Sequence, residues 1–152
     1  MKIRIVAVGK PRDKNVAAAI TEYEERAGRY WPLEVVEVRE ENTRDAVQAR
    51  AREADRLLEK VGLAGIVSCD ERGATFTSVE FAEWLQRQRE LARDVAFVIG
   101  GAHGLDARVA AGALCVLSLA PWTLPHEMAR LVLAEQLYRA GTIVRREPYH
   151  KS

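Results

Sequence analysis

The C-terminal tail of the chain carries the side chains whose types best suit chemistry on a nucleic acid. Arg145, Arg146 and Lys151 are cationic, His150 can be protonated, and Tyr149 lies among them. Such side chains can pair with phosphates and stack on a base. A frayed, solvated terminus is the plain alternative, but a disordered end has little use for an aromatic side chain. The tail is therefore a candidate RNA contact.

A second candidate is the glycine-rich segment at residues 100–104 (GGAHG), which follows a continuous apolar run at residues 95–99. Glycines allow a tight turn and a close approach of the backbone to a ligand, and the following helix start offers free N–H groups. The spacing is not GxGxxG, and the Lys-Ser/Thr end of a P-loop is missing. A plain tight turn and a binding loop both remain open for this segment.

A third candidate is the apolar loop at residues 119–124 (LAPWTL), whose backbone freedom is limited by Pro121 within it and Pro125 after it. Backbone amides and carbonyls lined by Leu and Trp side chains suit a flat adenine ring. Pro125 suits the first position of a helix, and Glu127 would lie near the positive end of its dipole. A helix is therefore expected to begin here whatever the function.

That helix, expected from Pro125 to about Ala140, is apolar almost all round. A helix of this kind is buried on more than one side. In a chain of this size the second cover is expected from another subunit, and a symmetric dimer is the commonest arrangement. Glu135 and Arg139 stand four residues apart, so the simplest interpretation of this pair is an ion pair on the helix surface.

The histidines and cysteines do not suggest a metal site. His103, His126 and His150 lack metal-like spacing, and Cys69 and Cys115 lie in separate apolar runs. We therefore predict no metal, no disulfide framework and two buried thiols.

The composition limits the classes of protein to which the chain can belong. A chain of 152 residues with 48% hydrophobic and 30% charged residues fits one soluble domain with a real core. No apolar run approaches the roughly 20 residues that span a bilayer, and no secretory signal precedes the first strand-like run. The cytosol is the expected location. A net charge of +1 gives no global argument for nucleic acid, so any RNA contact must be local.

The candidate segments are separated by alternating strand-like and helical patterns. Strands are expected at residues 3–8, 33–38, 66–69, 95–99 and 114–119, a turn at 70–73, and helices at 13–28, 44–61 (capped by Asn42 or Thr43), from 78, from 106 and from 125. This alternation predicts a mainly parallel sheet with helices on both faces. Ligands of such sheets bind beyond the carboxyl ends of the strands, so residues 69–70, 100–104 and 119–124 are expected to share one pocket.

Taken together, several ordered motifs resemble the RlmH family, SPOUT-type methyltransferases of the large ribosomal subunit. The motifs lie at residues 5–10, 21–23, 97–101, 104–105, 117–118, 123–126, 130, 135, 137–140 and 148–151, so they cover essentially the whole chain. The resemblance implies a single α/β domain over residues 1–152 with a C-terminal trefoil knot, a rare exception to the rule that chains are unknotted.

The resemblance also implies an activity, namely methyl transfer from S-adenosylmethionine to N3 of a pseudouridine in 23S rRNA, with the assembled ribosome as substrate. By position, the cofactor contacts would be Cys69, Gly100, Leu119, Ala120, Pro121, Trp122, Thr123 and Leu124. His150 is the candidate base, Tyr149 would stack on or orient the target base, and Arg139 would favour its anionic form. The apolar helix suggests a site shared between two subunits.

Two other classes of function compete with this one. A ribosome-binding or assembly module without catalysis would keep the dimer and the basic tail. A nucleotide-dependent oxidoreductase is disfavoured, because the GxGxxG motif and the acidic residue about 20 positions beyond it are absent.

Overall fold

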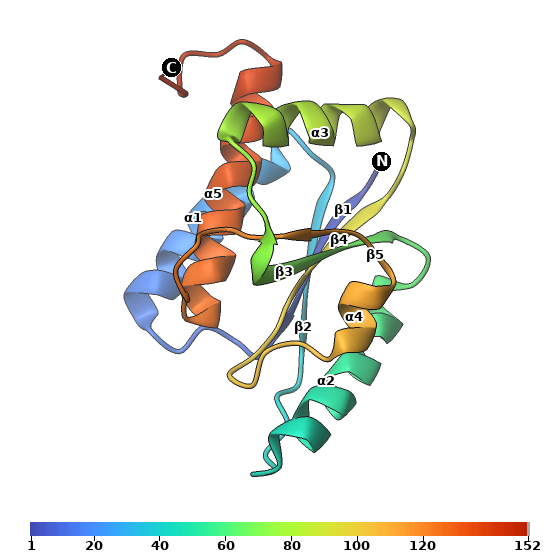
Figure 1. Cartoon of the computed structure of the whole chain (residues 1–152). Helices are drawn as coiled ribbons and strands as arrows, with labels where there is room; N and C mark the ends of the chain where they lie inside the picture. Colours follow the sequence, from blue (N-terminus) through green and yellow to red (C-terminus); the bar gives the residue numbers. More distant parts are fainter. Residues whose placement is uncertain (152) are drawn as a thin grey trace.

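The computed structural model describes residues 1–151, which form a single α/β domain around one sheet of five parallel strands in the order β2-β1-β4-β3-β5 (Figure 1). The strands are β1 Ile3–Val8, β2 Leu33–Val38, β3 Gly65–Ala74, β4 Val95–Ile99 and β5 Ala113–Leu117, and the helices are α1 Lys14–Gly28, α2 Ala46–Val61, α3 Ser78–Glu90, α4 Ala107–Ala111 and α5 His126–Val144. The predicted fold class is confirmed, and the C-terminal trefoil knot stays a prediction.

Helices cover both faces of the sheet, because a connection between parallel strands must cross one face or the other. Helices α1, α3 and α5 pack on one face around Ile5 and Phe97. Helices α2 and α4 cover the opposite face, to which Val6 and Val98 point. All five residues of β4 are buried, as expected for a central strand that is covered on both sides.

Residues 70–73, predicted as a turn after the strand, form a bulge within β3, which continues to Ala74. Cys69 and Ala74 of β3 both pair with Leu117 of β5, so residues 70–73 bulge out of the ladder between them. Gly73 makes the pairing feasible, since a Cβ there would lie only 2.4 Å from the carbonyl oxygen of Val116. The extension carries polar residues of β3 to the edge of the sheet where β5 ends.

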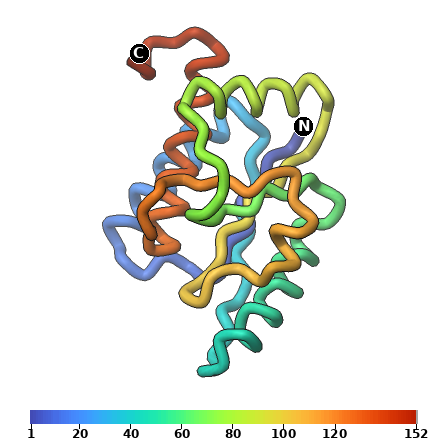
Figure 2. Tube along the Cα trace, viewed as in Figure 1, coloured from blue at the N-terminus to red at the C-terminus, as the bar shows by residue number. Residues whose placement is uncertain are grey.

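Two helix ends also differ from the prediction. Helix α2 is capped by Asp45, whose carboxylate accepts hydrogen bonds from the backbone N–H groups of Val47 and Gln48, and not by Asn42 or Thr43. Helix α5 runs to Val144, about one turn beyond the expected end. Figure 2 follows the chain from β5 through the loop and along the whole of this helix into the tail.

Helix α5 is buried on more than one side, as its composition predicts. The elements that pack against it, however, belong to the same chain. Leu133 and Leu137 belong to the core against the sheet, and the helix packs between α1 and α3. The homodimer inferred from this helix therefore stays a prediction.

A buried arginine ties α5 to two other elements. The Nε and Nη2 atoms of Arg130 donate to the carboxylate of Glu24 on α1, at 3.0 and 3.1 Å, and its Nη1 donates to Glu37 on β2 at 2.6 Å. These bonds offset the cost of burying the guanidinium. The start of α5 is thereby fixed in position beside the end of the sheet.

Among residues 1–151, no helix combines the length and the apolar character that crossing a membrane requires.

A substitution at Gly141 tests how closely α5 approaches the turn at Tyr30, which follows α1. A Cβ at this position would lie 2.4 Å from the Cβ and Cγ atoms of Tyr30, so Gly141→Ala must push the two elements apart. We expect a loss of about 1–3 kcal/mol in the free energy of unfolding, measured by urea denaturation. Gly28→Ala is the matched control, because a Cβ at Gly28 meets nothing within 4 Å. Equal effects of the two substitutions would contradict the packing described.

Candidate functional site

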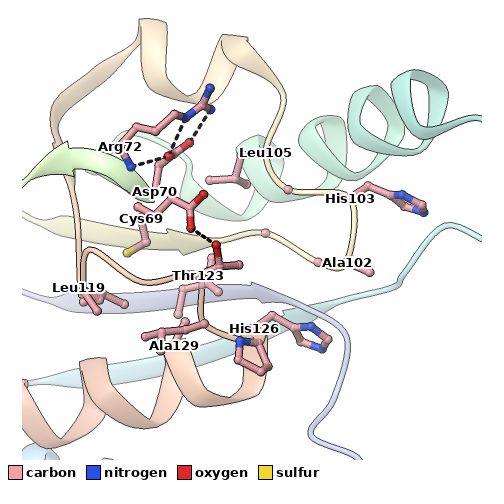
Figure 3. A pocket seen from close by; sticks show the side chains of 18 of the residues that line it. Cys69, Asp70, Arg72, Ala102, His103, Leu105, Leu119, Thr123, His126 and Ala129 are labelled. Carbon is pink, nitrogen blue, oxygen red and sulfur yellow. Dashed lines mark hydrogen bonds and ion pairs between the residues drawn. The ribbon is translucent and has the colours of Figure 1, made fainter.

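A pocket opens where β3, β4 and β5 end, with a volume of about 1080 Å³ (Figure 3). Its lining residues are Cys69, Asp70, Glu71 and Arg72 from β3; Ile99 at the end of β4 and Gly100, Gly101, Ala102, His103, Gly104 and Leu105 after it; Leu119, Ala120, Trp122, Thr123, Leu124, Pro125, His126 and Ala129 after β5; and Arg50 and Ala107. The prediction that the three strand ends share one pocket is confirmed. Of the residues proposed to contact a cofactor, Pro121 alone is not part of the lining.

The glycine-rich segment is both a tight turn and a wall of the pocket. The backbone N–H of Gly104 donates to the carbonyl oxygen of Gly101 at 3.0 Å, and Gly104 has a φ of 78°. A Cβ at Gly100 would lie 2.9 Å from the carbonyl carbon and oxygen of Gly104. The two interpretations left open by the sequence are therefore compatible, and no side chain fits at Gly100.

Hydrogen bonds hold the loop after β5 against the end of β3. The backbone N–H of Ser118 donates to the carbonyl oxygen of Ala74 at 2.8 Å, and the Ser118 hydroxyl donates to that of Ala120 at 2.8 Å. The Thr123 hydroxyl donates to the Glu71 carboxylate at 2.5 Å, as Figure 3 shows. The ring of Trp122, in contrast, is 80% exposed. The loop is fixed on its inner side and presents an apolar ring on its outer side.

Asp70 and Cys69 in β3 are not suited to acid-base chemistry at neutral pH. Arg72 holds the pKa of the Asp70 carboxyl below its usual range through its side-chain hydrogen bonds. Burial, with a smaller effect of Cys115, raises the pKa of the Cys69 thiol to about 12. Cys69 is therefore a neutral, weakly polar wall residue and not a nucleophile.

In the part of the chain that the structure describes, no group of three or more His, Cys, Asp or Glu residues is placed to hold a metal ion.

The tail packs against α5, so a frayed end is the wrong interpretation for Tyr149 and His150. Glu135 is the centre of this arrangement. One of its carboxylate oxygens accepts hydrogen bonds from Nε and Nη2 of Arg139, at 3.0 and 2.6 Å, and from the Tyr149 hydroxyl at 3.1 Å. The ring of Tyr149 lies edge-on to Tyr138, with centroids 4.6 Å apart. The three residues predicted to be catalytic therefore form one group.

The contacts of His150 define its tautomer. Nη1 of Arg139 lies 3.1 Å from Nδ1 of His150, and a guanidinium only donates. Nδ1 must therefore accept, which places the proton of the neutral ring on Nε2. The pKa of Tyr149 is raised, first by burial and then by its hydrogen bonds with Tyr23 and Glu135. The Tyr149 hydroxyl therefore keeps its proton and donates it to Glu135, whereas the neutral ring of His150 carries its proton on Nε2.

The tail does not lie at the pocket of its own chain. His126 lines the pocket, and Arg139 comes thirteen residues later on the same helix. At 1.5 Å per residue the separation along the axis is about 20 Å. Figure 1 shows the C-terminus beyond the far end of α5. The predicted catalytic residues and the predicted cofactor contacts therefore form two separate groups within one chain.

Sequence reasoning missed several residues of both groups. It treated Glu71 and Arg72 as part of a turn, although the glycine that allows β3 to continue stands next to them at Gly73. It treated Glu135 as half of a surface pair, since its second partner, Tyr149, lies fourteen residues away. No local signal connects Arg50 to the pocket, because it comes from the middle of α2.

Comparisons with known proteins agree with this geometry. A family model described as "Predicted SPOUT methyltransferase" matches residues 1–150. The chain is 57% identical to the ribosomal RNA large subunit methyltransferase H of Gemmatimonas aurantiaca, covering 99% of this chain and 100% of the relative. It is 52% identical to the protein of the same name from Anaeromyxobacter sp. (strain Fw109-5), with the same coverage.

A solved structure shares the fold. The SpoU methyltransferase AviRb from Streptomyces viridochromogenes, in complex with the cofactor AdoMet, aligns with a TM-score of 0.50 and 14% sequence identity. The alignment covers 97% of this chain and 59% of AviRb, so the chain spans about three fifths of that protein.

Proposed function

The chain belongs to the SPOUT methyltransferase family, among the ribosomal RNA large subunit methyltransferase H proteins, and on this premise we propose that it transfers a methyl group from S-adenosylmethionine to 23S rRNA. The acceptor is N3 of a pseudouridine in the stem-loop at the subunit interface, and the substrate is the assembled ribosome, which would place the protein in the cytoplasm. The observation that carries the proposal is the pocket formed by the ends of β3, β4 and β5.

The lining of the pocket suits S-adenosylmethionine. The half-buried side chains of Leu119 and Leu124 can cover the faces of an adenine ring, and the backbone around them supplies donors and acceptors for its edge. Gly100 keeps its part of the wall free of any side chain, because a Cβ there would meet the backbone of Gly104. The neutral thiol of Cys69 adds a small contact that does not react.

Bound there, S-adenosylmethionine supplies a methyl carbon that the positive sulfur makes electrophilic. In the proposed reaction the N3 proton passes to water, N3 forms the new bond to carbon, and the electron pair of the broken bond stays on sulfur. The chain has to align the two reactants and stabilise the negative charge that develops on the base.

We assign the tail to that second task. Loss of the N3 proton spreads negative charge onto the two carbonyl oxygens beside N3, where N–H donors are stabilising. Arg139 is cationic and His150 presents Nε2–H, since its Nδ1 accepts from Arg139. His150 then acts as a donor to a carbonyl oxygen, in place of the base predicted from the sequence. Tyr149 is half-buried beside them and is proposed to stack on or orient the target base.

The distance between tail and pocket supports a composite site. Since Arg139 lies about 20 Å along α5 from the pocket of its own chain, we propose a homodimer in which the tail of one protomer lies at the pocket of the other. A symmetric dimer would form two such sites.

The activity is tested by incubating the protein and labelled S-adenosylmethionine with ribosomes from a strain that lacks the modification. We expect one methyl group per ribosome, located by mass spectrometry at N3 of a single pseudouridine. Calorimetry should show uptake of S-adenosylmethionine by the protein alone. A protein that binds ribosomes but takes up no cofactor would instead be a binding or assembly module.

Two substitutions of His150 distinguish a hydrogen-bond donor from a general base by their effects on kcat. Asn can donate a hydrogen bond but cannot act as a base, so His150→Asn should keep a substantial part of kcat, whereas His150→Ala should lose about 100-fold or more. Cofactor affinity should not change in either variant. Equal losses of kcat in the two variants would indicate that His150 acts as a general base.

The composite site is tested by mixing subunits. Gly100→Val blocks the pocket and His150→Ala disables the tail, so each homodimer should be inactive. A mixed dimer regains one site with an intact pocket and an intact tail, and random exchange should restore about a quarter of the original turnover. Circular dichroism verifies that Gly100→Val is folded. No recovery after exchange, with mixed dimers demonstrated by mass spectrometry, would contradict a shared site.

A further inference from the structure

Arg89 and Arg145 contact Tyr30, at the end of α5 that lies away from the pocket of the same chain, and Arg146 follows Arg145 directly. Arg89 comes from α3, and Arg145 and Arg146 follow α5 directly. The guanidinium carbon of Arg89 lies 3.9 Å from the centre of the Trp31 ring, and its Nη2 donates to the carbonyl oxygen of Tyr30 at 2.9 Å. The guanidinium carbon of Arg145 lies 4.7 Å from the centre of the Tyr30 ring. We call Arg89, Arg145 and Arg146 the arginine cluster.

The ion pairs of the described residues do not include any member of this cluster. Among residues 1–151, no member has a carboxylate oxygen within 4 Å, whereas Arg130 and Arg139 are both paired. Glu147 lies in the same turn, but its carboxylate accepts a hydrogen bond from the Tyr30 hydroxyl. Burial and then the nearby charge of Arg145 lower the pKa of Arg89. Like charges held this close together are stabilised by an anion.

The backbone conformation at Arg146 also supports a functional role for this cluster. Arg146 has a φ of 58°, in the left-handed region that favours glycine. Its N–H donates to the carbonyl oxygen of Ile143 at 3.0 Å, and the N–H of Glu147 donates to that of Thr142 at 2.9 Å. This is the Schellman ending of a helix, in which glycine is the usual residue at the position of Arg146. An arginine here is unfavourable for folding, which indicates a role for its exposed side chain.

Guanidinium groups that lie on aromatic rings are held in place while their N–H edges stay free. Such edges match the oxygens of a phosphate, to which arginine can donate two hydrogen bonds at once. Arg145 and Arg146 are exposed, so their edges are open to a large partner. The total charge of the chain is only +1, so attraction to RNA must come from local groups such as this one.

We propose that the arginine cluster binds backbone phosphates of 23S rRNA and so orients the protein on the ribosome. This inference rests on the proposed function and adds a docking surface to it. The surface lies at the end of α5 from which the tail departs (Figure 1), about 27 Å along the helix from the pocket of the same chain. Phosphate contacts fix the register of a protein on a nucleic acid, whereas base contacts at the active site select the target.

The test compares the double variant Arg145→Gln/Arg146→Gln with the original chain in binding to purified ribosomes at several salt concentrations. Each lost phosphate contact should lower the slope of log affinity against log salt by about 1, so the slope should fall by about 2. Affinity at fixed salt should fall about tenfold. Arg44→Gln/Arg52→Gln is the matched control, because it removes the same charge from exposed positions on and beside α2. It should change the slope little.

Arg146→Gly distinguishes a binding role from a structural one. Glycine relieves the backbone at this position, so Tm should rise by about 2–4 °C, while the salt slope should still fall by about 1. Ribosome affinity that is unchanged in this variant and in the double variant would overturn the proposal. So would a loss of the dimer in light scattering, because the arginines would then belong to a subunit interface.

Measuring S-adenosylmethionine affinity in the same variants separates this inference from the proposed function. Unchanged cofactor affinity with weakened ribosome binding supports the docking surface. If the original chain neither binds the cofactor nor methylates ribosomes, the proposed function fails, and the salt dependence of ribosome binding still decides on the arginine cluster.

Discussion

The burial of α5 between α1, α3 and the sheet is the constraint on which the rest of the structure depends. Leu133 and Leu137 are fully buried there, and the indole N–H of Trp31 donates to the carbonyl oxygen of Leu137 at 2.9 Å. Gly141 lets the helix approach Tyr30 more closely than any other residue would. Because α5 is held along its whole length, it sets the positions of both the pocket wall at its start and the tail at its end.

A second constraint comes from the parallel sheet. The carboxyl ends of its strands meet at one edge, so the late part of β3 converges with the loops that follow β4 and β5. The sequence places residues with little tendency to react in this region, such as Gly100 and the neutral thiol of Cys69. This suits a reaction in which the electrophile arrives with the methyl donor and the protein's main task is alignment.

The charged side chains divide into two kinds according to their partners. Arg130 and Arg139 are paired with carboxylates and hold elements of the chain together. Arg145 and Arg146 have no such partner in the described residues and lie exposed at the end of α5. With a net charge close to zero, this division gives the chain a local site for an anion without making its whole surface basic, which fits docking on a preformed particle better than wrapping free RNA.

The sequence by itself determined the elements that depend on neighbours along the chain. The apolar runs of β1, β2 and β4 gave the correct bounds, and the alternation of strands and helices gave the parallel sheet and its shared edge. Tertiary structure alone decided what depends on distant residues: the extension of β3 past Gly73, the hydrogen bonds that make Glu135 a centre for the tail, and the meeting of Arg89 with Arg145. Local patterns report backbone preference and burial, whereas these contacts exist only because packing brings remote segments together.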